Sequence, residues 1–195
     1  MCALSAELVK LKRSLAWPML VLLPIVLVLA GAATQLADGR APENGWHTVW
    51  LQSVGFYGLF PLAIGIAILG SLVWRVEHRG SNWNALMSGP TSSLRIVTAK
   101  AVVVAGLTGI MQVVLLAALI VIGKAAFGLP GMLPGEYLAV TGLLIVATIP
   151  AAAIQSALSM FLRSFAAPVA VALVASGIST AALMAIGNAA LVSPY

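Results

Sequence analysis

The chain has 195 residues, of which 62% are hydrophobic and only 8% are charged. A soluble domain of ordinary composition carries about 25% charged residues, so this chain has too little polar surface to fold as a water-soluble protein. Its net charge of +5 does not indicate nucleic-acid binding, because the charges lie at the ends of apolar runs, where they act as topology signals and contact lipid headgroups. The single cysteine, Cys2, excludes an intrachain disulfide, and neither a metal site nor a cofactor is expected.

Apolar runs long enough to cross a bilayer dominate the sequence, since about 20 apolar residues span the hydrocarbon core. They cover residues 14–37, 51–74, 101–123, 137–162 and 164–187. Strands with open edges would leave backbone groups unpaired in lipid, so each run is predicted to be a helix. Prolines such as Pro61 and Pro150 interrupt the runs and are expected to bend them. The sequence therefore predicts an all-α membrane protein with one transmembrane domain over residues 1–195 and five transmembrane helices.

The first run also needs comparison with a signal peptide. It follows a basic start and contains Ala30-Gly31-Ala32, a small-residue pattern like that of a cleavage site. However, the run is longer than the roughly 7–15 apolar residues of a signal peptide. We therefore expect a retained span.

The distribution of basic residues predicts the orientation. Of the ten Lys and Arg residues, eight lie before the first run, between the second and third, or between the fourth and fifth. These eight are Lys10, Lys12, Arg13, Arg75, Arg79, Arg95, Lys100 and Arg163. The basic side of a membrane protein is cytoplasmic, which predicts a cytoplasmic N-terminus.

Before the first run, Leu4, Leu8, Leu11 and Leu15 recur at helical spacing while Ser5, Glu7, Lys10 and Lys12 point elsewhere. This segment is either an interfacial helix or an extension of the first span.

The sequence lacks several motifs for nucleotide binding and catalysis. It has no G-x-x-x-x-G-K-[ST] phosphate loop, no H-E-x-x-H and no G-x-S-x-G, and the five runs contain no Asp, Glu, Lys, Arg or His. The chain is therefore not expected to be an enzyme, and a partner must supply the energy for any uphill transport. Among the polar residues in the runs, Gln112 and Gln155 either line a substrate path or form hydrogen bonds between helices.

The connection over residues 75–100 shows the most organised pattern. Ser81 or Asn82 can cap a helix start, and Trp83, Leu86 and Met87 then share one face. Gly89 and Pro90 end this helix, and Thr91, Ser92 or Ser93 caps the next helix, which continues into the third run. A short helix of this kind either docks in the groove of a soluble partner or lies on lipid.

Two stretches carry a family resemblance: Ala6-Glu-Leu-Val-Lys-Leu-Lys-Arg-Ser14, and the connection with Glu77, Gly80-Ser-Asn-Trp83, Leu86-Met-Ser-Gly-Pro90, Ser92-Ser-Leu-Arg95 and Lys100. Together with the order of spans, they resemble the membrane subunit of ABC-2-type transporters. The nearer likeness is to the lantibiotic-protection permease group, which exports or expels antimicrobial peptides. In this family the loop helix is a coupling helix that contacts a separate ATP-binding subunit. The resemblance implies that Glu77, Trp83, Leu86 and Met87 contact that ATPase, and that a second permease subunit, identical or related, faces the first.

The expected function is therefore a permease subunit in the bacterial cytoplasmic membrane that uses a separate ATPase to export antimicrobial peptide, drug or lipid-like cargo. The alternative is a membrane scaffold or assembly factor without transport activity. Such permeases usually have six spans, whereas five are found here. Gly187 and Asn188 interrupt the fifth run as at the entry to a turn, so we expect the natural gene to continue after Tyr195 with about 20 or more apolar residues.

Overall fold

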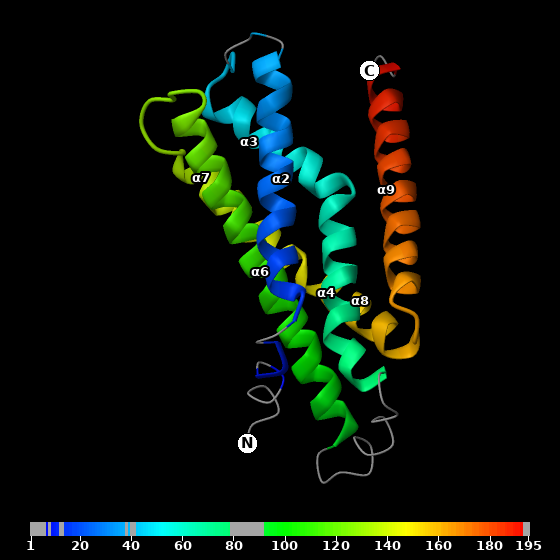
Figure 1. Cartoon of the computed structure of the whole chain (residues 1–195). Coiled ribbons are helices and arrows are strands. Elements are labelled where there is room, and N and C mark those ends of the chain that lie inside the picture. Colours follow the sequence, from blue (N-terminus) through cyan, green and yellow to red (C-terminus); the bar gives the residue numbers. More distant parts are fainter. Residues whose placement is uncertain are drawn as a thin grey trace.

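The computed structural model describes residues 7, 9–11, 14–37, 39, 42–78 and 92–192, with side chains described up to residue 186. Within these ranges every regular element is an α-helix. The helices are α2 (Ala16–Ala37), α3 (Trp46–Leu59), α4 (Pro61–His78), α6 (Ser93–Ala125), α7 (Gly135–Ala147), α8 (Ile149–Phe161) and α9 (Ala166–Val192) (Figure 1).

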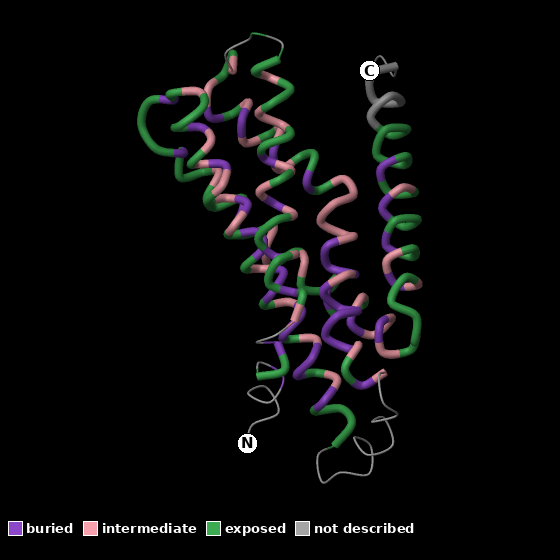
Figure 2. Tube along the Cα trace, in the orientation of Figure 1, coloured by how far each residue is buried: buried purple, intermediate pink, exposed green. Residues whose placement is uncertain are grey.

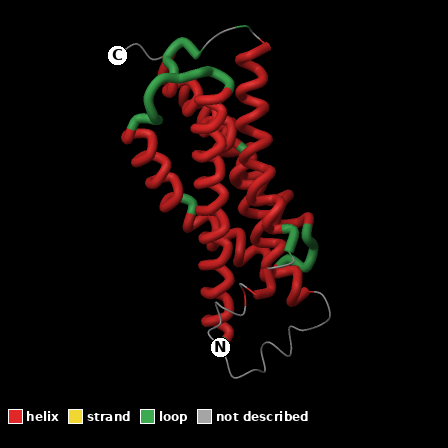
Figure 3. The backbone as a smooth tube through the Cα atoms, turned by 60° about the vertical axis from the view of Figure 1, so that its left-hand side comes forward, coloured by secondary structure: helices red, strands yellow, loops and turns green. Residues whose placement is uncertain are grey.

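The predicted fold class is confirmed. Five helical stretches are long and apolar enough to cross a membrane, and each overlaps one of the five predicted runs: Ala16–Ala37, Pro61–His78, Ser93–Ala125, Gly135–Phe161 and Ala166–Ile186. In the turned view of Figure 3, most of the connecting segments lie at the two ends of the bundle. This arrangement is the one a bilayer requires, because loops with unpaired backbone groups are excluded from its hydrocarbon region.

Two of the predicted spans are divided. The run over residues 51–74 falls on α3 and α4, which are separated at Phe60, a residue with φ −132° and ψ −46°. Pro61 follows as the first residue of α4, where its missing N–H would have had no helical partner. The run over residues 137–162 is divided between α7 and α8 at Thr148, two residues before Pro150, which cannot donate to a preceding carbonyl.

The helix α4 lies at the centre of the bundle. In the 18-residue window of Pro61–His78, 56% of the residues are buried, against 11% for Gly135–Phe161 and 17% for Ala166–Ile186. Figure 2 shows the same contrast, with α9 mostly exposed along its length. The exposed apolar side chains of the outer helices suit lipid tails, which are as apolar as the side chains themselves.

The helix α6 is the longest element, and its packing against α2 and α4 forms much of the core. Buried side chains shared by these three helices include Leu20, Val28, Ile66, Leu69, Val104, Leu107, Met111 and Leu115. At the far end of α6, Gly123 allows α3 to approach, since a Cβ there would lie 2.5 Å from the Trp46 ring. The Trp46 indole N–H also donates to the Pro130 carbonyl at 2.9 Å and so joins α3 to the loop between α6 and α7.

The predicted interruption at Gly187 and Asn188 is wrong. The backbone of α9 stays helical through both residues to Val192. A glycine in a helix costs only about 1 kcal/mol relative to alanine, which a long apolar helix tolerates without ending. The start of α6 agrees with the prediction, because the helix begins at Ser93 with Ser92 at its N-cap position and continues into the third span.

Candidate functional site

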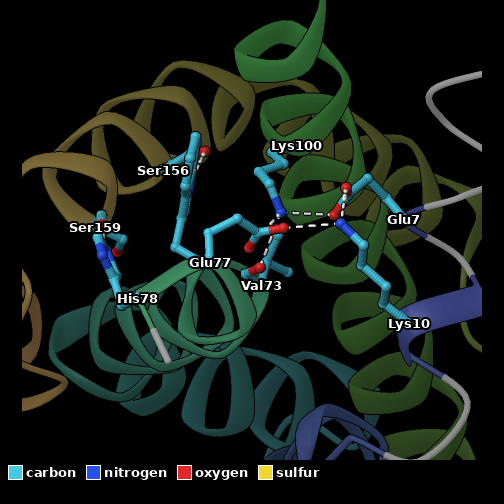
Figure 4. A network of polar contacts seen from close by, with 9 residues as sticks. Glu7, Lys10, Val73, Glu77, His78, Lys100, Ser156 and Ser159 are labelled. Carbon is cyan, nitrogen blue, oxygen red and sulfur yellow. Dashed lines mark hydrogen bonds and ion pairs between the residues drawn. The ribbon is translucent and has the colours of Figure 1, made fainter. Parts of the chain in front are cut away.

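Four charged side chains meet at one end of the bundle. The N-terminal segment supplies Glu7 and Lys10, the last turn of α4 supplies Glu77, and the second turn of α6 supplies Lys100. Figure 4 shows these side chains pointing toward one another. We call this set the charge ring.

The contacts of the charge ring alternate in sign and close on themselves. Lys10 Nζ lies 2.7 Å from Glu7 Oε1 and 2.8 Å from Glu77 Oε1. Lys100 Nζ lies 2.6 Å from Glu7 Oε2 and 3.0 Å from Glu77 Oε2. The first three contacts are also hydrogen bonds, whereas the fourth is an ion pair without hydrogen-bond geometry. Two carboxylates and two ammonium groups give the charge ring a net charge of zero.

Burial makes these pairings obligatory. The exposed fraction is 0% for Lys100, 3% for Glu77 and 7% for Glu7. A buried ion without a partner is strongly unfavourable, so each of these groups depends on the others for its charge. Burial lowers the pKa of Lys10, but its hydrogen bonds to Glu7 and Glu77 more than offset this effect and hold the pKa above its usual value. Lys10 therefore stays protonated at neutral pH.

Helical spacing explains how α4 and α6 present these side chains. Glu77 follows Val73 by four residues, which places both on one face of α4. The Val73 carbonyl accepts a further hydrogen bond from Lys100 Nζ at 3.1 Å. Lys100 Nζ also lies 4.9 Å from the centre of the Trp74 ring, a distance suited to a cation–π contact. On α6, Ile96 and Lys100 are four residues apart and both are buried.

The other side of α4 is held against α8. The Trp74 indole N–H donates to Ser156 Oγ at 3.0 Å, and His78 Nε2 donates to the Ser159 carbonyl at 2.8 Å (Figure 4). Because a carbonyl only accepts, His78 carries a hydrogen on Nε2 in this contact. The last turn of α4 is thus fixed on one side by the charge ring and on the other by α8.

The charge ring lies next to the segment for which a coupling role is predicted. Glu77 is in the last turn of α4, directly before residues 79–91, and Lys100 is in the second turn of α6, after them. The predicted contact residues Trp83, Leu86 and Met87 fall outside the residues that the structure describes. Of the four predicted ATPase contacts, only Glu77 is described, and its carboxylate points at Lys10 and Lys100 instead of the surface.

The two glutamines proposed for a substrate path lie on different helices. Gln112 of α6 is 3% exposed, and its Nε2 donates to Thr148 Oγ1 at 3.0 Å, directly at the break between α7 and α8. This contact matches the alternative role, a hydrogen bond between helices. Gln155 of α8 is half-buried, and its Oε1 has no hydrogen-bond partner within the described ranges.

The charge ring was not predicted from the sequence, because Lys10 and Lys100 were interpreted as topology signals. One signal was available. Of the five acidic residues in the chain, only Glu7 and Glu77 lie on the predicted basic side, and both belong to the charge ring. Two isolated acids among eight basic residues would have indicated specific pairing.

Comparisons with known proteins give one match. Residues 3–179 match the sequence model of a family described as "ABC-2 family transporter protein". The matched range includes all four residues of the charge ring and continues into α9. Neither a curated protein sequence nor a solved structure is detectably similar to the chain.

Proposed function

The chain belongs to the ABC-2 transporter family and is a multi-pass membrane permease component, and we propose that its charge-ring end is where a separate ATPase subunit drives transport. The basic residues favour a cytoplasmic location for this end, with the N-terminus on the same side. A cytoplasmic ATPase would then meet residues 79–91 directly.

The observation that carries this proposal is the position of the charge ring. It joins the N-terminal segment to both helices that flank residues 79–91. A movement of that segment caused by the ATPase would therefore be transmitted to α4 and α6 together. The reason is that Glu77 of α4 and Lys100 of α6 bind each other, while Glu77 also binds Lys10 and Lys100 also binds Glu7.

The energy for transport is assigned to the partner. The chain has no phosphate-cradling loop of its own. In the proposed cycle, ATP binding closes a pair of ATPase subunits, and the coupling segments convey the movement to two facing permease subunits, identical or related. The spans then shift against one another as rigid elements and open a path for cargo.

The cargo that we propose is an antimicrobial peptide, a drug or a lipid-like molecule, exported across a bacterial cytoplasmic membrane. Support comes from the resemblance of the N-terminal and coupling segments to lantibiotic-protection permeases. The five apolar runs contain no Asp, Glu, Lys, Arg or His, which suits amphipathic cargo better than small ions.

ATP hydrolysis tests the division of labour. The purified chain alone is expected to release no phosphate from ATP, whereas the chain with its ATPase in proteoliposomes should hydrolyse ATP and move cargo. The control is the same complex with the phosphate-loop lysine of the ATPase replaced, which should do neither. Turnover by the isolated chain, free of contaminating ATPase, would contradict the proposal. A stable complex that hydrolyses ATP without moving any of the three cargo classes would instead support the scaffold function.

A further inference from the structure

A second cluster of polar groups lies on the opposite side of α4 from the charge ring. A cavity of about 250 Å³ opens between the last turns of α4 and the connection from α8 to α9. Its polar lining comprises Ser71, Arg75 and His78 of α4, Ser159 of α8, and Arg163 and Ser164 of the connection. Figure 1 shows that these segments lie at the same end of the bundle as the N-terminal segment.

The lining of this cavity is basic. It contains two arginines and a histidine, and no aspartate or glutamate. Within the described part of the chain, neither Arg75 nor Arg163 forms an ion pair with a carboxylate. Glu77, the one acidic residue of α4, is already bound by Lys10 and Lys100. The positive charge of the cavity is therefore available to an anion.

A buried hydroxyl adds a second, independent observation. Ser159 is 1% exposed, and its Oγ has no hydrogen-bond partner among the described residues. Buried polar groups are nearly always hydrogen-bonded, so the unpartnered hydroxyl of this cavity-lining residue can still form a hydrogen bond with a ligand. An oxygen of a bound anion would satisfy it. The neighbouring Ser71 hydroxyl is already paired, since it donates to the Phe165 carbonyl at 3.4 Å.

We propose that this cavity binds the phosphate headgroup of an anionic phospholipid. The planar guanidinium groups of Arg75 and Arg163 suit phosphate oxygens, and the Ser159 hydroxyl donates to a third. Basic pockets between transmembrane helices on the cytoplasmic side are the expected location for such headgroups. Phe165, which lines the cavity and is 44% exposed, gives the acyl chains an apolar surface that free phosphate would not need. Phe161, which directly precedes Leu162 of the lining, is 74% exposed.

The position of the site connects it to the ends of three helices. Arg75 lies on α4, two residues before Glu77, while Arg163 lies in the turn into α9. Among the helices, α9 packs mainly against α4. A headgroup held between Arg75 and Arg163 would fasten α9 to α4 at the end where the charge ring lies. The lipid thus stabilises the packing of α9, of whose spanning stretch only 17% is buried.

Lipid competition in native mass spectrometry tests the site. The purified full chain is exposed to equal amounts of phosphatidylglycerol and phosphatidylcholine with identical acyl chains. We expect the chain to retain one phosphatidylglycerol with at least a tenfold preference, and Arg163→Gln to reduce that preference to near one. Arg163 is the principal target because Arg75 also lines a second cavity, together with Glu7 and Lys10 of the charge ring. Arg95→Gln, which removes an exposed arginine of α6 at the same end, is the matched control and should keep the preference.

Ser159→Ala provides a second variant that separates binding from folding. Removing an unpartnered hydroxyl should leave the melting temperature of the delipidated protein unchanged or higher. The increase in melting temperature on adding phosphatidylglycerol should become smaller. Equal retention by the Arg163→Gln and unaltered chains, or equal loss in Arg95→Gln, would overturn the proposal. Displacement of the lipid by inorganic phosphate at similar concentration would assign the cavity to free phosphate and overturn it as well.

Discussion

Lys100→Met is expected to lower the free energy of unfolding by about 3–5 kcal/mol, the usual cost of removing one partner from a buried ion pair. Among the ion pairs of the described residues, the variant leaves the buried carboxylates of Glu7 and Glu77 with Lys10 alone. It also removes the hydrogen bond to the Val73 carbonyl. The measurement is a denaturant titration of the purified protein in detergent micelles.

Two further variants separate the charge ring from general effects of charge. Arg95→Met removes a positive charge from the same helix, but at an exposed position, and should change stability by less than about 1 kcal/mol. Lys100→Met combined with Glu7→Gln restores neutrality around the remaining Lys10–Glu77 pair, and should recover at least half of the lost stability. Equal destabilisation by Arg95→Met and Lys100→Met would show that the charge ring has no special structural role.

Trp83→Ala combined with Leu86→Ala is expected to weaken capture of the ATPase about thirtyfold. A tryptophan at the centre of an interface can contribute 2 kcal/mol or more, and this energy corresponds to that factor. The affinity can be measured by titrating purified ATPase against the permease in nanodiscs. The variant should still insert, because neither Trp83 nor Leu86 belongs to one of the five spanning stretches.

Leu94→Ala is the matched control for this double variant. Leu94 lies in the first turn of α6, shortly after residues 79–91, and is 73% exposed. Its loss should leave the affinity for the ATPase unchanged. If the double variant also binds the ATPase with unchanged affinity, the segment around Trp83 lies on lipid and does not form the docking site.

The spans could be predicted from the sequence because membrane insertion depends on local composition. Five apolar runs of sufficient length correspond to the five spanning stretches, and the caps at residues 91–93 correctly placed the start of α6. The division of two spans at Phe60 and Thr148 was harder to predict from the sequence. A proline can bend, break or barely disturb a membrane helix, and the outcome depends on which neighbouring helices pair the freed backbone groups.

The site was predictable only in part because its contacts connect distant positions in the sequence. Lys100 and Glu7 are separated by 93 residues, and no local pattern predicts that they pair. Glu77 was found through its family resemblance, but its expected contact was a partner protein, whereas in the structure it contacts two lysines. The positive-inside rule does not distinguish exposed basic residues such as Arg95 from buried ones such as Lys100.

Site-specific cross-linking tests the coupling role of the charge-ring end most directly. A photoreactive amino acid at Met87 is expected to cross-link to the ATPase in membranes that contain both proteins. The same amino acid at Met132 should give no such product, because Met132 is 67% exposed in the loop between α6 and α7, and Figure 1 shows this loop at the other end of the bundle. Cross-linking from Met132 but not from Met87 would place the ATPase at the opposite end and contradict the account.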